Sequence, residues 1–137
     1  MRVLIAEDDS VSRRFIEQMV RGLGYDVTVC GDGNEAWDRI ETEPVDIALL
    51  DWMMPGTSGI DVCRKVRSRD EHGFNYLYII MITARNAQED IIQCFNAGAD
   101  DFIVKPVDSN MLASRLRVGN RLVQYEAVLA ENNVRLQ

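Results

Sequence analysis

Five short apolar runs alternate with longer amphipathic segments along this chain of 137 residues. The runs occupy residues 3–6, 27–30, 47–50, 77–82 and 102–104. Each run is rich in Val, Ile or Leu and shows little polar alternation, which is typical of strands buried on both faces of a sheet. Because such strands need helices on both sides, the pattern predicts a parallel sheet of five buried strands.

The segments between the runs carry apolar residues three and four positions apart, which predicts amphipathic helices. The apolar positions of four of them fall within residues 11–23, 36–40, 60–66 and 91–95. Gly22 and Gly24 are expected to close the first helix and Gly98 the fourth, while Asp108 is expected to cap a fifth. The alternation predicts a doubly wound α/β fold of the flavodoxin-like (βα)5 type, with strand order 2-1-3-4-5.

The last helix is predicted to be long, because no proline interrupts the chain from residue 108 to residue 137. About 30 residues of helix span about 45 Å, which is more than a small sheet needs. Gly119 is expected to weaken this helix by about 1 kcal/mol relative to Ala. Its second half carries a seam at alternating spacings of four and three, formed by Val118, Leu122, Tyr125, Leu129, Asn132 and Leu136. This spacing favours a short coiled coil with one polar position, and the alternative is an unpaired amphipathic tail.

Composition and charge exclude several classes of protein. With 15 Lys and Arg against 22 Asp and Glu, the formal net charge is −7. Nucleic acids and anionic membranes are bound by dense positive surfaces, so we expect this domain to bind neither. No apolar run approaches the roughly 20 residues of a membrane span, and the acidic start MRVLIAEDD is not that of a secretory signal.

The cysteines and the single histidine narrow the chemistry further. Cys30, Cys63 and Cys94 form no CxxC pair and no even framework, which favours a reducing, cytoplasmic setting. His72 is the one histidine, which argues against a histidine-built zinc site and against a Ser-His-Asp triad. Residues 67–75 around it form the longest polar connection, which we interpret as a surface loop without chemistry.

Polar side chains follow four of the five predicted strands. They are Glu7, Asp8 and Asp9 after the first strand, Asp51 after the third, Thr83 after the fourth and Lys105 after the fifth. In an open parallel sheet, ligands bind outside the carboxyl ends of the strands, so these side chains should share one cleft. An oxygen-only ligand set suits a hard divalent cation such as Mg²⁺ or Mn²⁺. A carboxylate there can act as a nucleophile toward phosphorus, with a lysine and a hydroxyl contacting the phosphoryl oxygens.

Each of these residues also has an ordinary structural interpretation. Asp8 or Asp9 could cap the first helix, and Thr83 could cap the fourth. Asp51 could be a turn residue, and Lys105 a solvated loop lysine. The joint occurrence of complementary groups at four strand ends favours a functional site.

Four segments carry a resemblance to a known family, namely VLIAEDDSVSRR, ALLDWMMPGTSGIDVCRKVR, IIMITA and GADDFIVKP. In this order they resemble the receiver domain of two-component response regulators, over roughly residues 1–120. The resemblance implies that Asp51 is the phosphoacceptor and also a metal ligand. It implies that Asp8 binds Mg²⁺ directly, that Glu7 does so through water, and that the backbone carbonyl of Met53 is the third protein ligand.

The resemblance also implies the residues of a conformational switch. Thr83 is expected to be the switch hydroxyl, Phe102 the switch aromatic residue, and Lys105 the lysine that contacts the phosphoryl group. The bond between Lys105 and Pro106 is expected to be cis, as is usual in the family. Two departures from the commoner family pattern are Glu7 in place of an aspartate and Phe102 in place of a tyrosine.

The implied function is a phosphorylation-controlled signalling switch. A sensor histidine kinase or a histidine phosphotransfer protein would supply the phosphoryl group, and the domain, not otherwise an enzyme, would catalyse its own phosphorylation and dephosphorylation. The output would pass through the face of the fourth helix, the fifth strand and the fifth helix. The receiver domain would comprise residues 1–120, and residues 121–137 would form a coiled-coil-like linker toward an output domain. Within this linker, residues 125–133 weakly resemble the linker before a diguanylate cyclase.

The resemblance and the long helix make two further predictions. The seam favours a weak homodimer that phosphorylation strengthens, and Arg115 and Arg117 are expected to pair with Asp100 and Asp101 across its two-fold interface. The alternative for these charges is a solvated surface. Arg85 and the residue at position 53 are expected to border the water that attacks the phosphoryl group. Neither would orient this water, which predicts slow dephosphorylation.

Three rival classes of protein lack a required feature in this sequence. A phosphatase of the haloacid dehalogenase type uses a second carboxylate two residues after the nucleophile, where Met53 stands. A flavin carrier needs a Ser/Thr/Gly-rich phosphate loop after the first strand, where three consecutive acidic residues stand. A pseudo-receiver that acts only through binding would lack Asp51, Lys105 or the acidic pair, and all of these are present.

Overall fold

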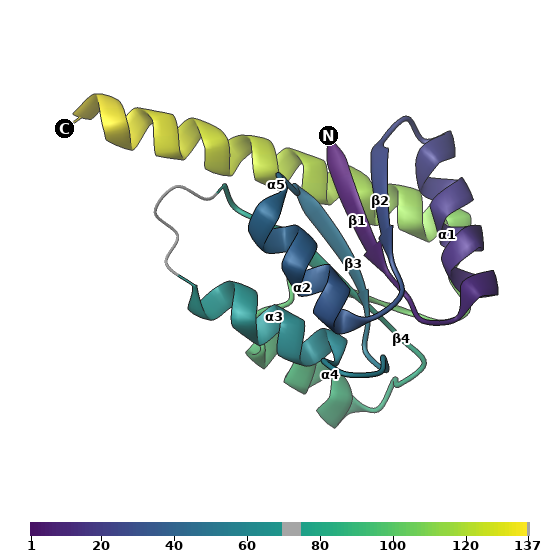
Figure 1. The fold of residues 1–137 in the computed structure, drawn as a ribbon. Helices are drawn as coiled ribbons and strands as arrows, with labels where there is room; N and C mark the ends of the chain where they lie inside the picture. Colours follow the sequence, from purple (N-terminus) through teal and green to yellow (C-terminus); the bar gives the residue numbers. More distant parts are fainter. Residues whose placement is uncertain (70–74, 137) are drawn as a thin grey trace.

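The computed structural model describes residues 1–69 and 75–136, with side chains up to residue 131. Within these limits, five strands alternate with five helices (Figure 1). The strands are β1 (Arg2–Ala6), β2 (Asp26–Cys30), β3 (Ile47–Asp51), β4 (Tyr78–Thr83) and β5 (Asp101–Val104). The helices are α1 (Ser10–Gly22), α2 (Gly33–Thr42), α3 (Gly59–Ser68), α4 (Gln88–Asn96) and α5 (Ser109–Leu136). His72 lies outside the described residues.

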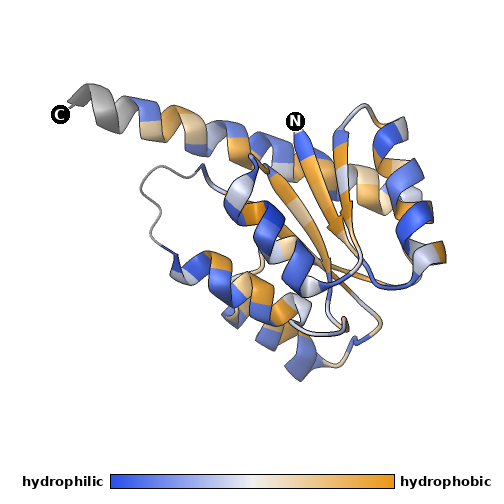
Figure 2. Cartoon of the chain, viewed as in Figure 1, coloured by the Kyte–Doolittle hydropathy of each residue, from blue (hydrophilic) through white to orange (hydrophobic). Residues whose placement is uncertain are grey.

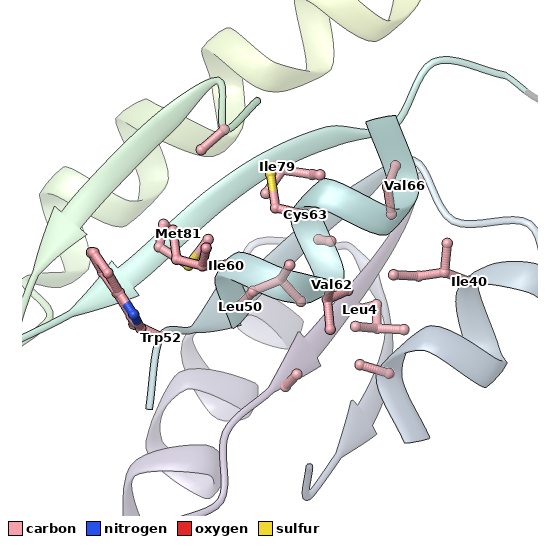
Figure 3. Close-up of a cluster of buried hydrophobic side chains, with 14 of the residues drawn as sticks. Leu4, Ile40, Leu50, Trp52, Ile60, Val62, Cys63, Val66, Ile79 and Met81 are labelled. Atoms are coloured by element: carbon pink, nitrogen blue, oxygen red, sulfur yellow. The ribbon is translucent and has the colours of Figure 1, made fainter. Parts of the chain in front are cut away.

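All five strands pair in parallel, in the order β2-β1-β3-β4-β5, which confirms the predicted doubly wound topology. Side chains alternate between the two faces of the sheet, so that Leu4 packs on one face while Val3 and Ile5 pack on the other. The first face is covered by α2, α3 and α4, and Figure 3 shows part of its core. The second is covered by α1 and α5. Burial on both faces explains why β1 after its first residue, and β3, are largely orange, that is hydrophobic, in Figure 2.

The strand register aligns the carboxyl ends of the four strands that lead to the predicted site. Ala6 of β1 pairs with Leu50 of β3, so the residues that follow them lie side by side. In the same way Asp51 pairs with Ile82 of β4, and Thr83 pairs with Val104 of β5. Glu7, Asp51, Thr83 and Lys105 therefore all stand at the carboxyl edge of the sheet.

Polar side chains and glycines set the ends of the helices. Asp9 Oδ2 accepts the backbone N–H of Ser12 at 2.8 Å, so Asp9 and not Asp8 caps α1. Gly22 is the last residue of α1, and Gly24 ends the turn that follows it with a φ of 94°. Gly98 follows α4 with a φ of 107°, and Asp108 Oδ2 accepts the N–H of Met111, as predicted.

Helix α5 lies along the sheet and then projects well past it (Figure 1). Leu112, Leu116 and Val123 bury its inner side against the face that α1 shares. Gly119 is buried there as well, and a Cβ on it would lie 2.7 Å from Cδ1 of Tyr78. Gly119 therefore has a packing role that the expected weakening of the helix did not include, because its missing side chain admits the Tyr78 ring.

Gly119→Ala should lower the free energy of unfolding by about 1 kcal/mol, although alanine favours helix. The methyl group collides with a ring that is 4% exposed, and such overpacking costs about 1–3 kcal/mol. Gly22→Ala is the matched control, because nothing lies within 4 Å of its Cβ position. It should raise stability by up to about 1 kcal/mol. Urea denaturation of both variants tests this, and a stabilising Gly119→Ala would contradict the packing role.

Candidate functional site

Three polar side chains are buried in the described part of the chain, and all three lie at the carboxyl edge of the sheet. Glu7 is 1% exposed, Thr83 is 2% exposed and Asp51 is 5% exposed. Burying a carboxylate is costly unless it is paired or binds a cation. Two such carboxylates at one edge therefore require compensating positive charge.

Lys105 supplies a first positive charge between these two carboxylates. Its Nζ donates to both carboxylate oxygens of Glu7, at 3.2 and 3.0 Å, and to Oδ2 of Asp51 at 3.2 Å. The Lys105 N–H donates to the carbonyl of Thr83 at 2.8 Å, which ties the lysine to the end of β4. The bond from Lys105 to Pro106 is cis, as predicted. Lys105 is thus no solvated loop lysine.

Asp8 adds a third carboxylate, on the solvent side of the other two. Glu7, Asp8 and Asp51 each offer one oxygen, and these oxygens lie within 4.8 Å of one another. An all-oxygen set with excess negative charge fits a hard divalent cation such as Mg²⁺ or Mn²⁺. Met53 is the second residue after Asp51 and is 63% exposed. That its backbone carbonyl binds the metal remains a prediction.

The crowding of acidic groups shows in the pKa values of the site. Burial, and then the neighbouring Asp51, raise the pKa of Glu7 from 4.5 to about 7, against the opposing effect of Lys105. Burial lowers the pKa of Lys105, but its contacts with Glu7 and Asp51 outweigh this effect and raise that pKa overall. The lysine therefore stays charged, and a second cation would favour the ionised form of Glu7.

The backbone of Asp51 is held closely by the loop that follows it. The Trp52 N–H donates to the carbonyl of Ile82, and the Gly59 N–H donates to the carbonyl of Trp52, each at 3.0 Å. A Cβ on Gly59 would lie 2.2 Å from the carbonyl oxygen of Asp51, so only glycine fits there. This close approach fixes the position of Asp51 at the edge of the sheet.

Thr83 and Phe102 lie in different surroundings on neighbouring strands. Thr83 Oγ1 accepts the backbone N–H of Arg85 at 2.8 Å. Thr83 is not the cap of α4, because Ala87 occupies that position without a side-chain hydrogen bond. The half-buried Phe102 packs edge-to-face on Phe95 of α4, with ring centroids 5.8 Å apart. Phe102 therefore links β5 to α4.

Sequence reasoning missed the surroundings of Arg85. Its guanidinium lies over the ring of Trp52, 4.8 Å from the centroid, and its Nη1 is 3.7 Å from Oδ1 of Asp90 in α4. The sequence predicted only that Arg85 borders the attacking water. Its position two residues after Thr83, with Trp52 directly after Asp51, is the one signal that could have suggested this contact.

The interpretation of residues 67–75 as a loop without chemistry was wrong at its first two residues, since α3 extends to Ser68, and residues 70–74 lie outside the described part of the chain. Arg67 belongs to α3, and its guanidinium donates to the carbonyls of Leu77 and Gly98 and to Oδ2 of Asp100. The Tyr76 hydroxyl also donates to Asp100. This network ties α3 to the amino ends of β4 and β5.

Both acidic residues that were expected to form ion pairs across a dimer interface already pair with an arginine of the same chain. The Arg67 guanidinium forms an ion pair with Asp100, with Nη2 2.8 Å from Oδ2. Arg115 Nη1 lies 3.3 Å from Oδ2 of Asp101 in the same chain. Arg117 is exposed. The predicted pairing of these charges between two copies is therefore not needed to satisfy Asp100 or Asp101.

The fold and this edge of the sheet define a class of protein, and comparison with known sequences identifies it. The family model described as "Response regulator receiver domain" matches residues 3–117. The chain belongs to this family. No helix in the described residues is long and apolar enough to cross a membrane.

Curated relatives are similar over the same part of the chain. The DNA-binding response regulator MtrA of Mycobacterium tuberculosis is 37% identical over 116 residues, which cover 85% of this chain and 49% of the relative. The sensory transduction protein RegX3 of Mycolicibacterium smegmatis is 38% identical over 115 residues, which cover 84% and 48%. The chain thus spans about half the length of these relatives.

Solved receiver structures share the fold. The Francisella response regulator 1452 receiver domain is 32% identical, with a TM-score of 0.79 and coverage of 88% of this chain and 96% of that one. A CheY-like receiver domain protein from Methanospirillum hungatei is 26% identical, with a TM-score of 0.78 and coverage of 92% and 95%. These similarities confirm the flavodoxin-like receiver fold.

Glu7→Gln should reduce the loss of stability between pH 4.5 and 7 in metal-free buffer. Folding raises the pKa of Glu7 from 4.5 to about 7, so the unfolded chain loses this proton first as the pH rises. The contribution of Glu7 to stability is therefore full below pH 4.5 and decreases up to pH 7. Urea denaturation in EDTA measures it, with Glu41→Gln, at an exposed position in α2, as control. The same pH dependence in Glu7→Gln and the parent protein would contradict the assignment.

Proposed function

We propose that this chain is a phosphorylation-controlled switch in which Asp51 accepts a phosphoryl group from a histidine kinase or a histidine phosphotransfer protein in the cytoplasm. The observation that carries the proposal is the Lys105 ammonium, placed between buried Asp51 and Glu7 beside an exposed Asp8. A phosphorylated aspartate needs a fixed cation and a metal site next to it, and both are supported by this arrangement.

In the proposed reaction, an Asp51 carboxylate oxygen attacks the phosphorus of a phosphohistidine. The O–P bond forms as the P–N bond breaks, and the electron pair of that bond remains on the imidazole nitrogen of the donor. Lys105 Nζ, 3.2 Å from Oδ2 of Asp51, lies where it can contact a transferred phosphoryl oxygen. Hydrolysis of the same group by water returns Asp51 to its starting state, so the domain turns over its own phosphorylation.

Glu7, Asp8, Asp51 and the Met53 carbonyl would hold Mg²⁺ or Mn²⁺. The bound cation neutralises charge on the transferring phosphoryl group. Asp8 is the exposed member of the set and can bind the cation directly, while Glu7, already in contact with Lys105, is placed to do so through water. The acidic cluster supports this assignment.

The switch proposed for this site starts at Thr83. A phosphoryl oxygen on Asp51 offers the Thr83 hydroxyl a stronger, charged hydrogen-bond acceptor. Movement of Thr83 toward it leaves room for Phe102, whose ring now packs on Phe95. The face formed by α4, β5 and α5 then changes, as a shift between two populations, and passes the signal on.

Asp51→Asn should abolish the gain of one phosphoryl group when the protein is incubated with acetyl phosphate and Mg²⁺. Asparagine is nearly isosteric but has no carboxylate nucleophile. Intact-mass spectrometry measures the gain, EDTA should prevent it in the parent protein, and Asp61→Asn, at an exposed position in α3, is the control. Undiminished phosphorylation of Asp51→Asn would refute the proposed phosphoacceptor.

We propose that α5 leads toward an output domain. The chain spans about half of relatives that include a protein named as a DNA-binding regulator. This favours a DNA-binding output over the diguanylate cyclase that the helical run at residues 125–133 suggests. In either case the receiver domain, with a net charge of −7, would control the output without contacting nucleic acid itself.

The projecting part of α5 supports a homodimer. Its apolar seam is open to solvent, with Val118 41%, Leu122 36%, Tyr125 65% and Leu129 56% exposed. Asn132 and Leu136, which complete the predicted seam, lie beyond the described side chains. Two copies packed in parallel would bury the same stripe on each, as a two-fold interface requires. The short seam predicts weak association, which phosphorylation strengthens through the adjoining α4-β5-α5 face.

Leu122→Lys combined with Leu129→Lys should keep the protein monomeric with or without phosphorylation. Two charges per copy in the seam repel and cannot be buried. Sedimentation at high micromolar concentration measures the effect, with Gln124→Lys, exposed but outside the seam, as control. A parent protein that is monomeric in both states, or a dimer that survives the double substitution, would refute the coiled-coil interface.

A further inference from the structure

The loop between β3 and α3, residues 52–58, carries the proposed metal ligand at position 53 and is fixed at its base. The Gly59 N–H donates to the Trp52 carbonyl at 3.0 Å, which closes the loop next to Asp51. Ser58, the last residue of the loop, caps α3 through its side chain. These contacts fix where the loop starts and ends, and the conformation between its ends depends on contacts with another element.

The amino end of α2 supplies these contacts. Thr57 Oγ1 donates to Asn34 Oδ1 at 2.5 Å, across 23 positions of the chain. A Cβ on Gly33, the first residue of α2, would collide with the Thr57 carbonyl. A Cβ on Gly56, where φ is 73°, would lie 2.7 Å from Asn34 Nδ2. The loop and the helix therefore approach each other as closely as glycine allows, and the Asn34 amide lies over the turn.

The amino end of α2 is itself held in place. Asp32 Oδ1 accepts the N–H of Glu35 at 2.8 Å, and Glu35 Oε2 accepts the N–H of Gly31 at 3.2 Å. These reciprocal bonds satisfy backbone donors at the start of the helix. Ala36, in the first turn, is fully buried in the core. Helix α2 thus gives the loop a support that is fixed to the sheet independently of the site.

We propose that Asn34 is a positioning residue for the divalent cation. Its bond to Thr57 holds the loop in the conformation in which the Met53 carbonyl is directed to the site, and Asn34 does not itself contact the ion. This inference rests on the proposed function, because it concerns the cation proposed there, and it adds α2 to the elements that build the site.

A backbone carbonyl depends on such support more than a carboxylate does. Asp8 and Asp51 attract a cation through their charge, whereas a neutral carbonyl contributes only where the chain holds it at bonding distance. If the loop adopts that conformation only part of the time, the apparent affinity decreases by the same fraction. Groups behind a ligand that fix its orientation therefore contribute to metal affinity without touching the metal.

Mn²⁺ titration, with the free ion measured by electron paramagnetic resonance, tests the proposal without phosphorylation. Asn34→Ala and Thr57→Val should each raise the dissociation constant about fivefold, the effect of one net hydrogen bond. Thr57→Ser keeps the hydroxyl and should keep the parent affinity. The double variant Asn34→Ala with Thr57→Val should bind no more weakly than either single variant, because both remove the same bond.

Gly119→Ala is the matched control for stability, since it disturbs Tyr78 at the opposite end of β4 and should leave Mn²⁺ affinity unchanged. An unchanged affinity in Asn34→Ala, or losses that add in the double variant, would overturn the proposal. A parent protein that binds no Mn²⁺ would overturn the proposed metal site together with it.

A second measurement separates positioning from general damage to the site. In phosphorylation by acetyl phosphate, Asn34→Ala should need about fivefold more Mg²⁺ for half of its maximal rate, and should reach the parent rate at saturating Mg²⁺. A lower maximal rate with an unchanged Mg²⁺ requirement would contradict the inference. If the parent protein binds Mn²⁺ but gains no phosphoryl group, the proposed function fails, and the Mn²⁺ titration still decides the role of Asn34.

Discussion

The contact of Lys105 with two buried carboxylates is the interaction on which the site depends. Glu7 and Asp51 are almost fully excluded from water and lie close enough for Asp51 to raise the pKa of Glu7. One ammonium offsets part of this cost, since it contacts both. The excess negative charge that remains, increased by Asp8, is what would favour the proposed divalent cation at this edge of the sheet.

The fold makes this arrangement possible by aligning strand ends that are far apart in sequence. Glu7 and Lys105 are 98 residues apart, yet β1 and β5 both end at the same edge of one parallel sheet. Backbone contacts set the position of this edge, because the Lys105 N–H bonds to the Thr83 carbonyl and Gly59 packs directly against the backbone of Asp51. Under the proposed function, a charge change at Asp51 would therefore be passed on mainly through side chains, of which Thr83 is the buried hydroxyl at the same edge.

The residues of this edge could be predicted from the sequence because each follows directly on an apolar strand. Residues whose role depends on contacts across the fold could not be predicted in this way. Arg67 bonds to Asp100 across 33 positions, so a charged residue at the end of a helix was mistaken for part of a loop. Gly119 was read as a weak point of α5, because helix propensity carries no information about the Tyr78 ring that it admits.

Locating the phosphoryl group tests the central claim most directly. Sodium borohydride reduces an acyl phosphate to an alcohol, so peptide mass spectrometry after acetyl phosphate treatment identifies the carboxylate that carried the group. The account predicts reduction at Asp51 alone, because Lys105 contacts it and the loop from β3 fixes its position. Reduction at Glu7, Asp8 or Asp9, or at no residue, would contradict it.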